Sequence, residues 1–407
     1  MPLRVYDSFL RRMETLTPSR DGTLRVFVCG PTVYDYAHLG HARTYISFDI
    51  ILRYLTFLGH KVRYLMNITD IAESIVKRAA ELKRDPFDIA REYEKAFLED
   101  MESLRITNVE RYERASAYIP EMIAQVKGLM NKGVAYETET GVYFEVKKFP
   151  KFGQLSGQSQ EELGLRRLEL CSSKRNAEDF SLWRRYERGL GWDSPWGYGR
   201  PGWHIEDTAI SMTNFGETYD IHCGASELIF PHHEAEIAQA EALTGKSPFV
   251  RFWLHTGLLS VRGRKMSKSL GNVLRIRDAL ETYTAAELRY YFASFHYRQP
   301  MAVSNTGLRL AKHRLNSMVK NFQAFLKSKS GTGAASQDKK LMTLVQRAKA
   351  IFVRRMDNDF DTPNALRALT DLSYRLSELA KPGLGAEQAK RYAEREFRKM
   401  ADVFGIL

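Results

Sequence analysis

The sequence is poor in cysteine and has no long hydrophobic run. Three of its 407 residues are cysteine, which does not suggest the disulfide framework of a small secreted protein. No stretch approaches the ~18 apolar residues of a membrane span, and the N-terminus lacks the charged-then-apolar pattern of a signal peptide. We therefore expect a cytoplasmic protein with no membrane partner. Its length and its 44% hydrophobic residues predict about two to three domains with full cores.

Acidic residues are scarce relative to basic ones. Sixty-one Lys and Arg residues stand against forty-nine Asp and Glu, which leaves a formal net charge of +12. This excess favours a polyanionic partner such as a nucleic acid. A generally basic proteome would give the same balance, so the charge alone does not identify the partner.

A strand, a sharp turn and a helix follow one another near the N-terminus. Residues 24–30 form an apolar run typical of a short buried strand, which Gly30-Pro31 ends. An apolar-periodic helix begins at about Leu39. Backbone N–H groups and the helix dipole favour anionic groups at a helix N-terminus, so this arrangement predicts a phosphate site.

The motif His38-Leu39-Gly40-His41 stands at the start of that helix. Gly40 has no Cβ and lets a nucleotide lie close to the backbone. His38 and His41 are three residues apart and can face the same ligand. We expect them to donate hydrogen bonds to phosphate oxygens while charge builds during attack on the α-phosphate of ATP. A lone His-x-x-His pair, however, is more often structural.

A second motif, Lys265-Met266-Ser267-Lys268-Ser269, follows more than two hundred residues later. Lys265 and Lys268 would neutralise the departing pyrophosphate from a mobile loop, and Ser267 would join them in binding ATP. Such a pentapeptide alone is usually a solvated loop. The two motifs in this order and context predict one chemistry, the formation of an acyl-adenylate from ATP and a carboxylic acid.

The pattern along the chain predicts an α/β protein with a Rossmann-like parallel sheet, an inserted domain and a C-terminal helical bundle. The expected divisions are 1–115 with 200–258 for the nucleotide-binding domain, 116–199 for the insertion, 259–310 for the Lys-Met-Ser loop and the region after it, and 311–407 for the helices. The small polar residues of 327–336 predict a mobile connection between two helices.

Several further segments carry a resemblance to a known family. The chain resembles the class I aminoacyl-tRNA synthetases, and among them the cysteinyl-tRNA synthetases, over almost its whole length. Besides the two motifs above and Cys29-Gly30, the resemblance rests on residues 67–70 (Asn-Ile-Thr-Asp), 174–180 (Lys-Arg-Asn-Ala-Glu-Asp-Phe), 199–206 (Gly-Arg-Pro-Gly-Trp-His-Ile-Glu), 230–234 (Phe-Pro-His-His-Glu) and 359–363 (Asp-Phe-Asp-Thr-Pro).

The resemblance implies an enzyme that activates an amino acid, expected to be cysteine, with ATP and Mg²⁺ and transfers it to tRNA. It implies that Thr69, Trp203 and His222 line the amino-acid pocket and that Gly30-Pro31 lies under the nucleotide. It also makes the insertion the family's connective domain, 259–310 its Lys-Met-Ser and stem-contact region, and the helices its tRNA-facing bundle. The chain stops where the family continues into an anticodon-reading module, so we expect that module to be missing. We expect the protein to act as a monomer.

The family also holds a zinc ion with two cysteines, a histidine and a glutamate. Three of these map onto Cys29, His232 and Glu236, and the four-residue spacing of the last two puts them on one helix face. Asp207 stands where the second cysteine is expected. Aspartate can bind zinc, but it is harder than cysteine and less selective for a soft thiolate.

Other outcomes for this site stay open at the level of sequence. Cys223 could supply the missing thiolate, although its simpler interpretation is a small buried hydrophobe. The site could instead hold another metal, or no metal with a different acid as substrate.

The function itself has two alternatives. One is a paralogue that activates a different amino acid or, like the mycothiol-pathway cysteine ligases, transfers cysteine to an amino sugar. The other is a non-catalytic pseudo-synthetase that binds RNA or a protein partner. Intact nucleotide motifs count against the second alternative.

Overall fold

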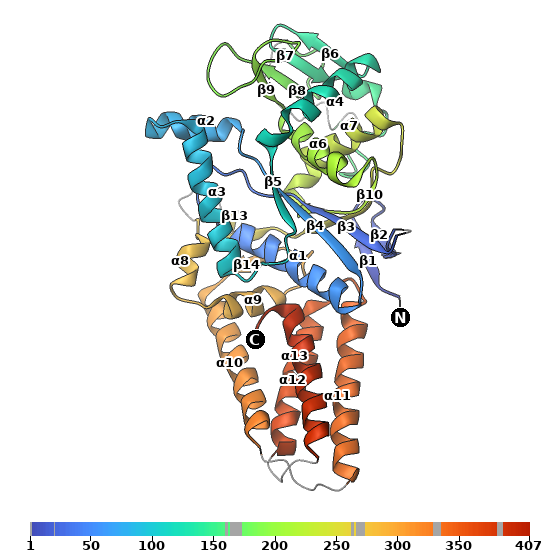
Figure 1. The fold of residues 1–407 in the computed structure, drawn as a ribbon, viewed down its shortest axis with the longest axis vertical. Coiled ribbons are helices and arrows are strands. Elements are labelled where there is room, and N and C mark those ends of the chain that lie inside the picture. Colours follow the sequence, from blue (N-terminus) through green and yellow to red (C-terminus); the bar gives the residue numbers. More distant parts are fainter. Residues whose placement is uncertain are drawn as a thin grey trace.

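The computed structural model of the protein describes residues 2–19, 21–158, 162, 173–261, 264–265, 273–328, 335–380 and 386–407. At its centre lies a five-stranded parallel sheet in the order β11-β10-β3-β4-β5 (Figure 1). The strands are β3 (Thr23–Val28), β4 (Lys61–Ile68), β5 (Arg111–Arg114), β10 (Tyr219–Ala225) and β11 (Val250–Thr256). The predicted α/β class with a parallel sheet is confirmed.

The strand order reverses between β3 and β10. From β3 the chain builds the sheet through β4 and β5 in one direction, and it later adds β10 and β11 on the other side of β3. Ligands of open parallel sheets bind at such a reversal, outside the carboxyl ends of the strands. Residues that follow β3 or lie toward the end of β10 are therefore placed at the expected ligand site.

Helices cover both faces of this sheet, so its central strands are apolar on both sides. Val26 and Val28 of β3 belong to one hydrophobic cluster with α1, while Phe27 between them belongs to a second cluster with α6 and α7. This alternation follows from the opposite directions of consecutive strand side chains. The helices are α1 (Leu39–Phe57), α6 (Trp203–Phe215) and α7 (Glu234–Thr244).

The segment between β5 and α6 contains a separate four-stranded antiparallel sheet in the order β6-β7-β8-β9 (Figure 1). Its elements are α4 (Ile119–Asn131), β6 (Ala135–Thr138), β7 (Gly141–Phe144), β8 (Phe180–Arg185) and β9 (Gly199–Pro201). Trp183 and Phe180 are fully buried in it. Because Gly202 alone separates β9 from α6, this sheet fixes where α6 begins.

The C-terminal part is a bundle of four helices that extends away from the central sheet (Figure 1). They are α10 (Asn305–Lys327), α11 (Ala335–Met356), α12 (Thr362–Ala380) and α13 (Glu387–Phe404). Apolar side chains form its core, where the rings of Phe322 and Phe397 stack with centroids 4.0 Å apart. The predicted helical bundle is confirmed. The connection predicted at 327–336 falls between α10 and α11, and its residues 329–334 lie outside the described residues.

One buried arginine joins the bundle to the sheet domain. Arg289 of α9 (Ala285–Ala293) is fully buried and donates to the Asp49 carboxylate on α1. Its Nε donates to the carbonyl oxygen of Phe404, the last residue of α13, at 2.6 Å. A charged side chain is tolerated here because an opposite charge and backbone acceptors satisfy it.

The remaining elements surround this framework. They are β1 (Arg4–Asp7), β2 (Arg12–Thr15), α2 (Glu73–Leu82), α3 (Pro86–Ser103), β12 (Leu259–Val261), β13 (Arg264–Lys265), α8 (Ile276–Leu280) and β14 (Met301–Val303). In the described part of the chain, none of the helices combines the length and the apolarity that a bilayer span requires.

Candidate active site

His38 and His41 form the N-terminal cap of α1. Nδ1 of His38 accepts the Gly40 N–H at 3.1 Å, and Nδ1 of His41 accepts the His38 N–H at 3.2 Å. The two rings stack with centroids 3.9 Å apart. Since a neutral imidazole that accepts at Nδ1 carries its proton on Nε2, the cap fixes both rings with Nε2 as the donor. This is the form that the predicted phosphate contacts require.

A cavity of about 350 Å³ lies beside this helix start. Its lining includes Gly30 and Pro31 from the turn after β3, and His38, Gly40 and His41 from the cap. Cys29 and Trp203, from the predicted metal and amino-acid sets, line the same cavity. The structure thus brings three sets of predicted site residues to one place, at the reversal of the strand order.

Gly30 is required by its surroundings. A Cβ at this position would lie 1.7 Å from the carbonyl oxygen of Asn67, a contact that the backbone cannot accommodate. The Gly30 N–H donates to Oδ1 of Asn67 at 2.6 Å, and Nδ2 of Asn67 donates to Oδ1 of Asp207 at 2.7 Å. Asn67 therefore links the turn under the cavity to the predicted metal ligands.

The predicted metal ligands Cys29, Asp207, His232 and Glu236 lie together, and all four are buried. Sγ of Cys29 lies 3.3 Å from Oδ2 of Asp207, which lies 3.2 Å from Nε2 of His232. The same His232 nitrogen is 3.2 Å from Oε1 of Glu236. Tetrahedral zinc with bonds of ~2.0–2.3 Å holds its donors about 3.3–3.8 Å apart, so these spacings suit one ion.

The electrostatics of this group also suit a cation. Burial, followed by the nearby Asp207 and Glu236 carboxylates, raises the pKa of the Cys29 thiol well above its usual value. Burial, followed by Asp207, likewise raises the pKa of Glu236. Among the described residues, neither carboxylate oxygen of Glu236 has a hydrogen-bond partner. A divalent ion would offset these costs, because buried charges are stable only when paired or bound to a metal.

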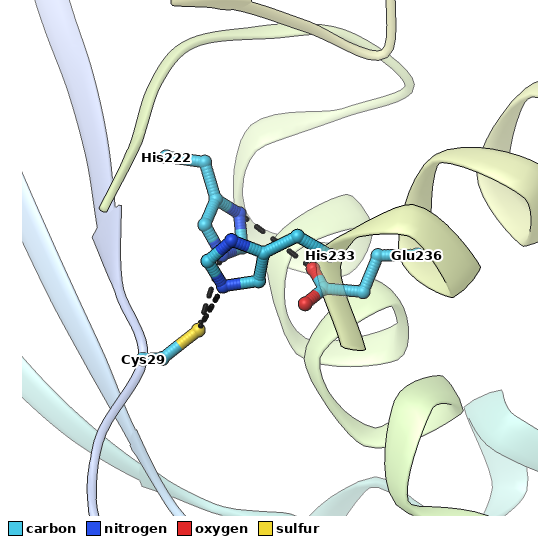
Figure 2. Close-up of side chains that lie close together, drawn as sticks. All are labelled: Cys29, His222, His233 and Glu236. Atoms are coloured by element: carbon cyan, nitrogen blue, oxygen red, sulfur yellow. Dashed lines mark hydrogen bonds and ion pairs between the residues drawn. The ribbon is translucent and has the colours of Figure 1, made fainter. Parts of the chain in front are cut away.

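Two further histidines face the same thiol. Nε2 of His222 lies 3.2 Å from Sγ of Cys29, and Nε2 of His233 lies 3.1 Å from it. Figure 2 shows both imidazoles between Cys29 and Glu236. Burial, followed by neighbouring imidazoles, lowers the pKa of both rings well below the usual value, so they are neutral at neutral pH. We call the six residues Cys29, Asp207, His222, His232, His233 and Glu236 the donor cluster.

The three residues predicted to line the amino-acid pocket are divided between the cavity wall and the protein interior. Trp203 is 44% exposed and stacks on the His232 ring with centroids 4.3 Å apart. Thr69 and His222 are buried, and Thr69 Oγ1 accepts from Nδ2 of Asn67 at 3.3 Å. Only Trp203 of the three is therefore placed to touch a ligand in the cavity directly.

Cys223 does not belong to the donor cluster. It is the neighbour of His222 on β10, and consecutive strand residues point to opposite faces. It is 1% exposed and lies in the hydrophobic cluster on the α1 side of the sheet. The alternative in which Cys223 replaces the missing cysteine is wrong for this structure, and its interpretation as a small buried hydrophobe agrees with it.

The Lys-Met-Ser motif is placed only in part. The backbone of Lys265 lies in β13, which pairs antiparallel with β12, and β12 begins at Leu259 in the cavity wall. Ser267 and Lys268 lie outside the described residues. Their roles stay predictions.

Neither Asn67 nor His233 was assigned an individual site role from the sequence. Asn67 lies near the carboxyl end of β4, and the position of the segment 67–70 at a strand end in a parallel sheet does indicate the ligand crevice. His233 offered no such signal, because a sequence does not tell which of two adjacent histidines faces a site.

Comparison with known proteins agrees with this geometry. The family described as "tRNA synthetases class I (C) catalytic domain" matches residues 15–313, and the DALR domain family matches residues 351–407. The chain therefore belongs to the class I tRNA synthetases, in the family of that catalytic domain.

The curated relatives narrow the family further. The chain is 43% identical over 413 residues to the cysteine–tRNA ligase of Thermococcus onnurineus, a match that covers all of this chain and 87% of the relative. It is 44% identical over 416 residues to the cysteine–tRNA ligase of Pyrococcus abyssi, with 100% and 86% covered.

Among solved structures, the fold resembles Mycobacterium tuberculosis methionyl-tRNA synthetase in complex with methionyl-adenylate. The TM-score is 0.68 at 16% identity, with 94% of this chain and 88% of that chain covered. This likeness supports the fold alone.

Proposed function

We propose that the protein is a cysteine–tRNA ligase. It activates cysteine with ATP to an aminoacyl-adenylate and transfers the aminoacyl group to tRNA. The observation that carries the proposal is the single cavity that unites the His38–His41 helix cap with Cys29 of the donor cluster. The full-length similarity to cysteine–tRNA ligases supports the choice of amino acid.

The first half-reaction uses the helix start. ATP lies over Gly30, Pro31 and Gly40, and Mg²⁺ would accompany it to offset part of the phosphate charge. Nε2 protons of His38 and His41 stabilise the charge that develops on the α-phosphate, and their Nδ1 atoms keep the rings in place through the cap. Lys265, Ser267 and Lys268 act on the pyrophosphate, as their position in the motif implies.

The amino acid is held at the inner wall of the cavity. Cys29, Asp207, His232 and Glu236 would hold zinc, which supplies a Lewis-acid partner for a thiolate. Trp203 covers His232, and the buried Thr69 and His222 support the pocket from below. Asn67 fixes Asp207 in place, as outer partners of metal ligands commonly do.

The helical bundle supplies a surface for tRNA. A groove of about 960 Å³ lies between α11 and α12. Its lining contains apolar side chains, the acidic Asp371 and Glu378, and six basic residues, namely Lys339, Lys340, Arg347, Arg355, Arg367 and Arg375. The six basic side chains suit a phosphate backbone, and the net charge of +12 agrees with this role.

We assign residues 1–115 and 200–258 to the catalytic domain, 116–199 to the connective insertion, 259–310 to the Lys-Met-Ser and stem-contact region, and 311–407 to the bundle. The cytoplasm, where ATP, cysteine and tRNA occur together, is the proposed location. The expected monomer stays a prediction.

The acceptor is tested by charging. The purified protein is incubated with ATP, labelled cysteine and either tRNA or glucosamine-type amino sugars. Label on tRNA alone supports the proposal. Label on the sugar and none on tRNA would contradict the proposal and assign the protein as a small-molecule cysteine ligase.

A further inference from the structure

The donor cluster contains a second complete set of metal ligands. Cys29, His222, His233 and Glu236 each offer a donor atom, these atoms all lie within 4.8 Å of one another, and all four residues are buried (Figure 2). The first set is Cys29, Asp207, His232 and Glu236. The second set shares Cys29 and Glu236 with it and has the imidazoles of His222 and His233 in place of Asp207 and His232. We propose that these four residues form a second position for a divalent metal ion, and that a single ion exchanges between this position and the first position, formed by Cys29, Asp207, His232 and Glu236.

The hydrogen bonds behind the two imidazoles fit this role. Nδ1 of His222 lies 2.5 Å from the Tyr219 hydroxyl, and Nδ1 of His233 lies 2.8 Å from Nε2 of His255. In both rings Nδ1 has a polar partner while Nε2 faces Sγ of Cys29. Nδ1 of His222 also lies 3.6 Å from Oε2 of Glu236. Ligating histidines characteristically have such a partner on the other ring nitrogen, because it fixes the ring and its tautomer.

The backbone makes room for His233. A Cβ on residue 224 would lie 2.7 Å from Cε1 and 3.1 Å from Nε2 of the His233 ring, so the glycine at this position permits the ring to lie against β10. Gly224 follows the His222-Cys223 pair on the same strand. The approach of His233 to Cys29 thus depends on the local sequence of β10.

Charge favours the second position. The first set contains three acidic ligands, Cys29, Asp207 and Glu236, whereas the second contains only Cys29 and Glu236 beside two neutral imidazoles. A divalent ion in the second set gives a neutral centre, which costs less in a buried site than a net negative one. Imidazole also suits zinc better than the harder carboxylate of Asp207 does.

The carboxylate of Asp207 keeps polar partners when the metal ion leaves it. Its Oδ1 accepts from Nδ2 of Asn67, and its Oδ2 lies 3.2 Å from Nε2 of His232. Nδ1 of His232 has a further partner in Nδ1 of His204 at 2.9 Å. Because Asp207 and His232 keep these contacts, the substitution of aspartate for cysteine leaves an ion free to take the other set.

The test counts metal ions in paired variants with Co²⁺ as the probe. Asp207→Asn with His232→Gln removes two ligands of the first set only, and His222→Gln with His233→Gln removes two of the second only. Cysteine-thiolate charge-transfer absorption and the bound Co²⁺ per chain are measured by titration. His313→Gln, at an exposed site on α10, is the matched control.

Each double variant is expected to bind one Co²⁺ per chain with thiolate absorption, within about a hundredfold of the wild-type affinity. The quadruple variant is expected to lose binding by a far larger factor. Failure of the Asp207→Asn/His232→Gln protein to bind stoichiometric Co²⁺ while remaining folded would overturn the second position, as would a wild-type protein that binds none.

A third variant keeps the test decisive if a double variant does not fold. Asp207→Cys adds a second thiolate to the first set alone and is expected to strengthen the charge-transfer absorption as the ion moves there. Unchanged absorption on stoichiometric binding would contradict an ion that exchanges between the sets.

The inference rests on the metal assignment above but not on turnover. Absence of cysteine activation with metal bound would therefore overturn the proposed function alone.

Discussion

The donor cluster and the core of the helical bundle are two buried regions built on opposite principles. In the bundle, rings such as Phe322 and Phe397 pack against each other, and burial of apolar area provides the stability. In the donor cluster, carboxylates, imidazoles and a thiol are buried at a cost that only pairing or a cation offsets. The first region maintains the fold, whereas the second is maintained for its chemistry.

The largest expected effect is on stability in the bundle. Phe397→Ala should lower the free energy of unfolding by about 3–5 kcal/mol, because it opens a cavity at a fully buried stacked ring. Bound metal per folded chain should stay unchanged. Urea unfolding measures the first quantity and cobalt titration the second. Arg391→Ala, at a side chain 78% exposed on the same helix, serves as control and should change stability by less than about 0.5 kcal/mol.

The next effect belongs to the catalytic region, and it should exceed the loss of stability of about 1 kcal/mol that follows from removing the cap hydrogen bond of His41. His41→Ala removes one preorganised donor at the helix start, so we expect adenylation to fall roughly a hundredfold or more, about 2.7 kcal/mol in barrier height. Pyrophosphate exchange at saturating ATP measures it, and thermal unfolding checks that the variant is folded. His313→Ala is the control. Near-normal exchange in the His41 variant would contradict the role given to the helix cap.

A smaller effect concerns a buried carboxylate outside both regions. Burial raises the pKa of Asp100 on α3 to about 6 from 3.8, and Arg277 opposes the shift. A raised carboxyl pKa favours the folded state below the unfolded value, and this contribution is lost as pH rises through 6. Relative to Asp100→Asn, the wild type should therefore lose about 2 kcal/mol of stability between pH 4.5 and 7.

Chemical unfolding across this pH range measures the difference. Asp88→Asn, at an exposed position on the same helix, is the matched control and should follow the wild type. A constant difference between wild type and Asp100→Asn would show that the carboxyl group titrates normally.

The sequence predicted the bundle and the nucleotide-binding turn because both depend on local patterns. Apolar periodicity marks the helices, and the run before Gly30 became β3 with α1 beginning at Leu39. These features require no knowledge of distant contacts.

The donor cluster was predictable only through the family resemblance, and then in part. Cys29, Asp207, His232 and Glu236 do meet, as expected. The approach of His222 and His233 to the same thiol depends on the register of β10 beside β3 and on the room left by Gly224. Neither is written in a local pattern, so the second ligand set appears only in three dimensions.

The most direct measurement is amino-acid-dependent ATP–pyrophosphate exchange with the purified protein, run across the common amino acids with and without added zinc. We predict exchange that depends on cysteine alone, which would show that the cluster recognises a thiol although Asp207 replaces the family's second cysteine. Exchange with another amino acid, or none with any, would contradict the assignment of this chain as a cysteine–tRNA ligase.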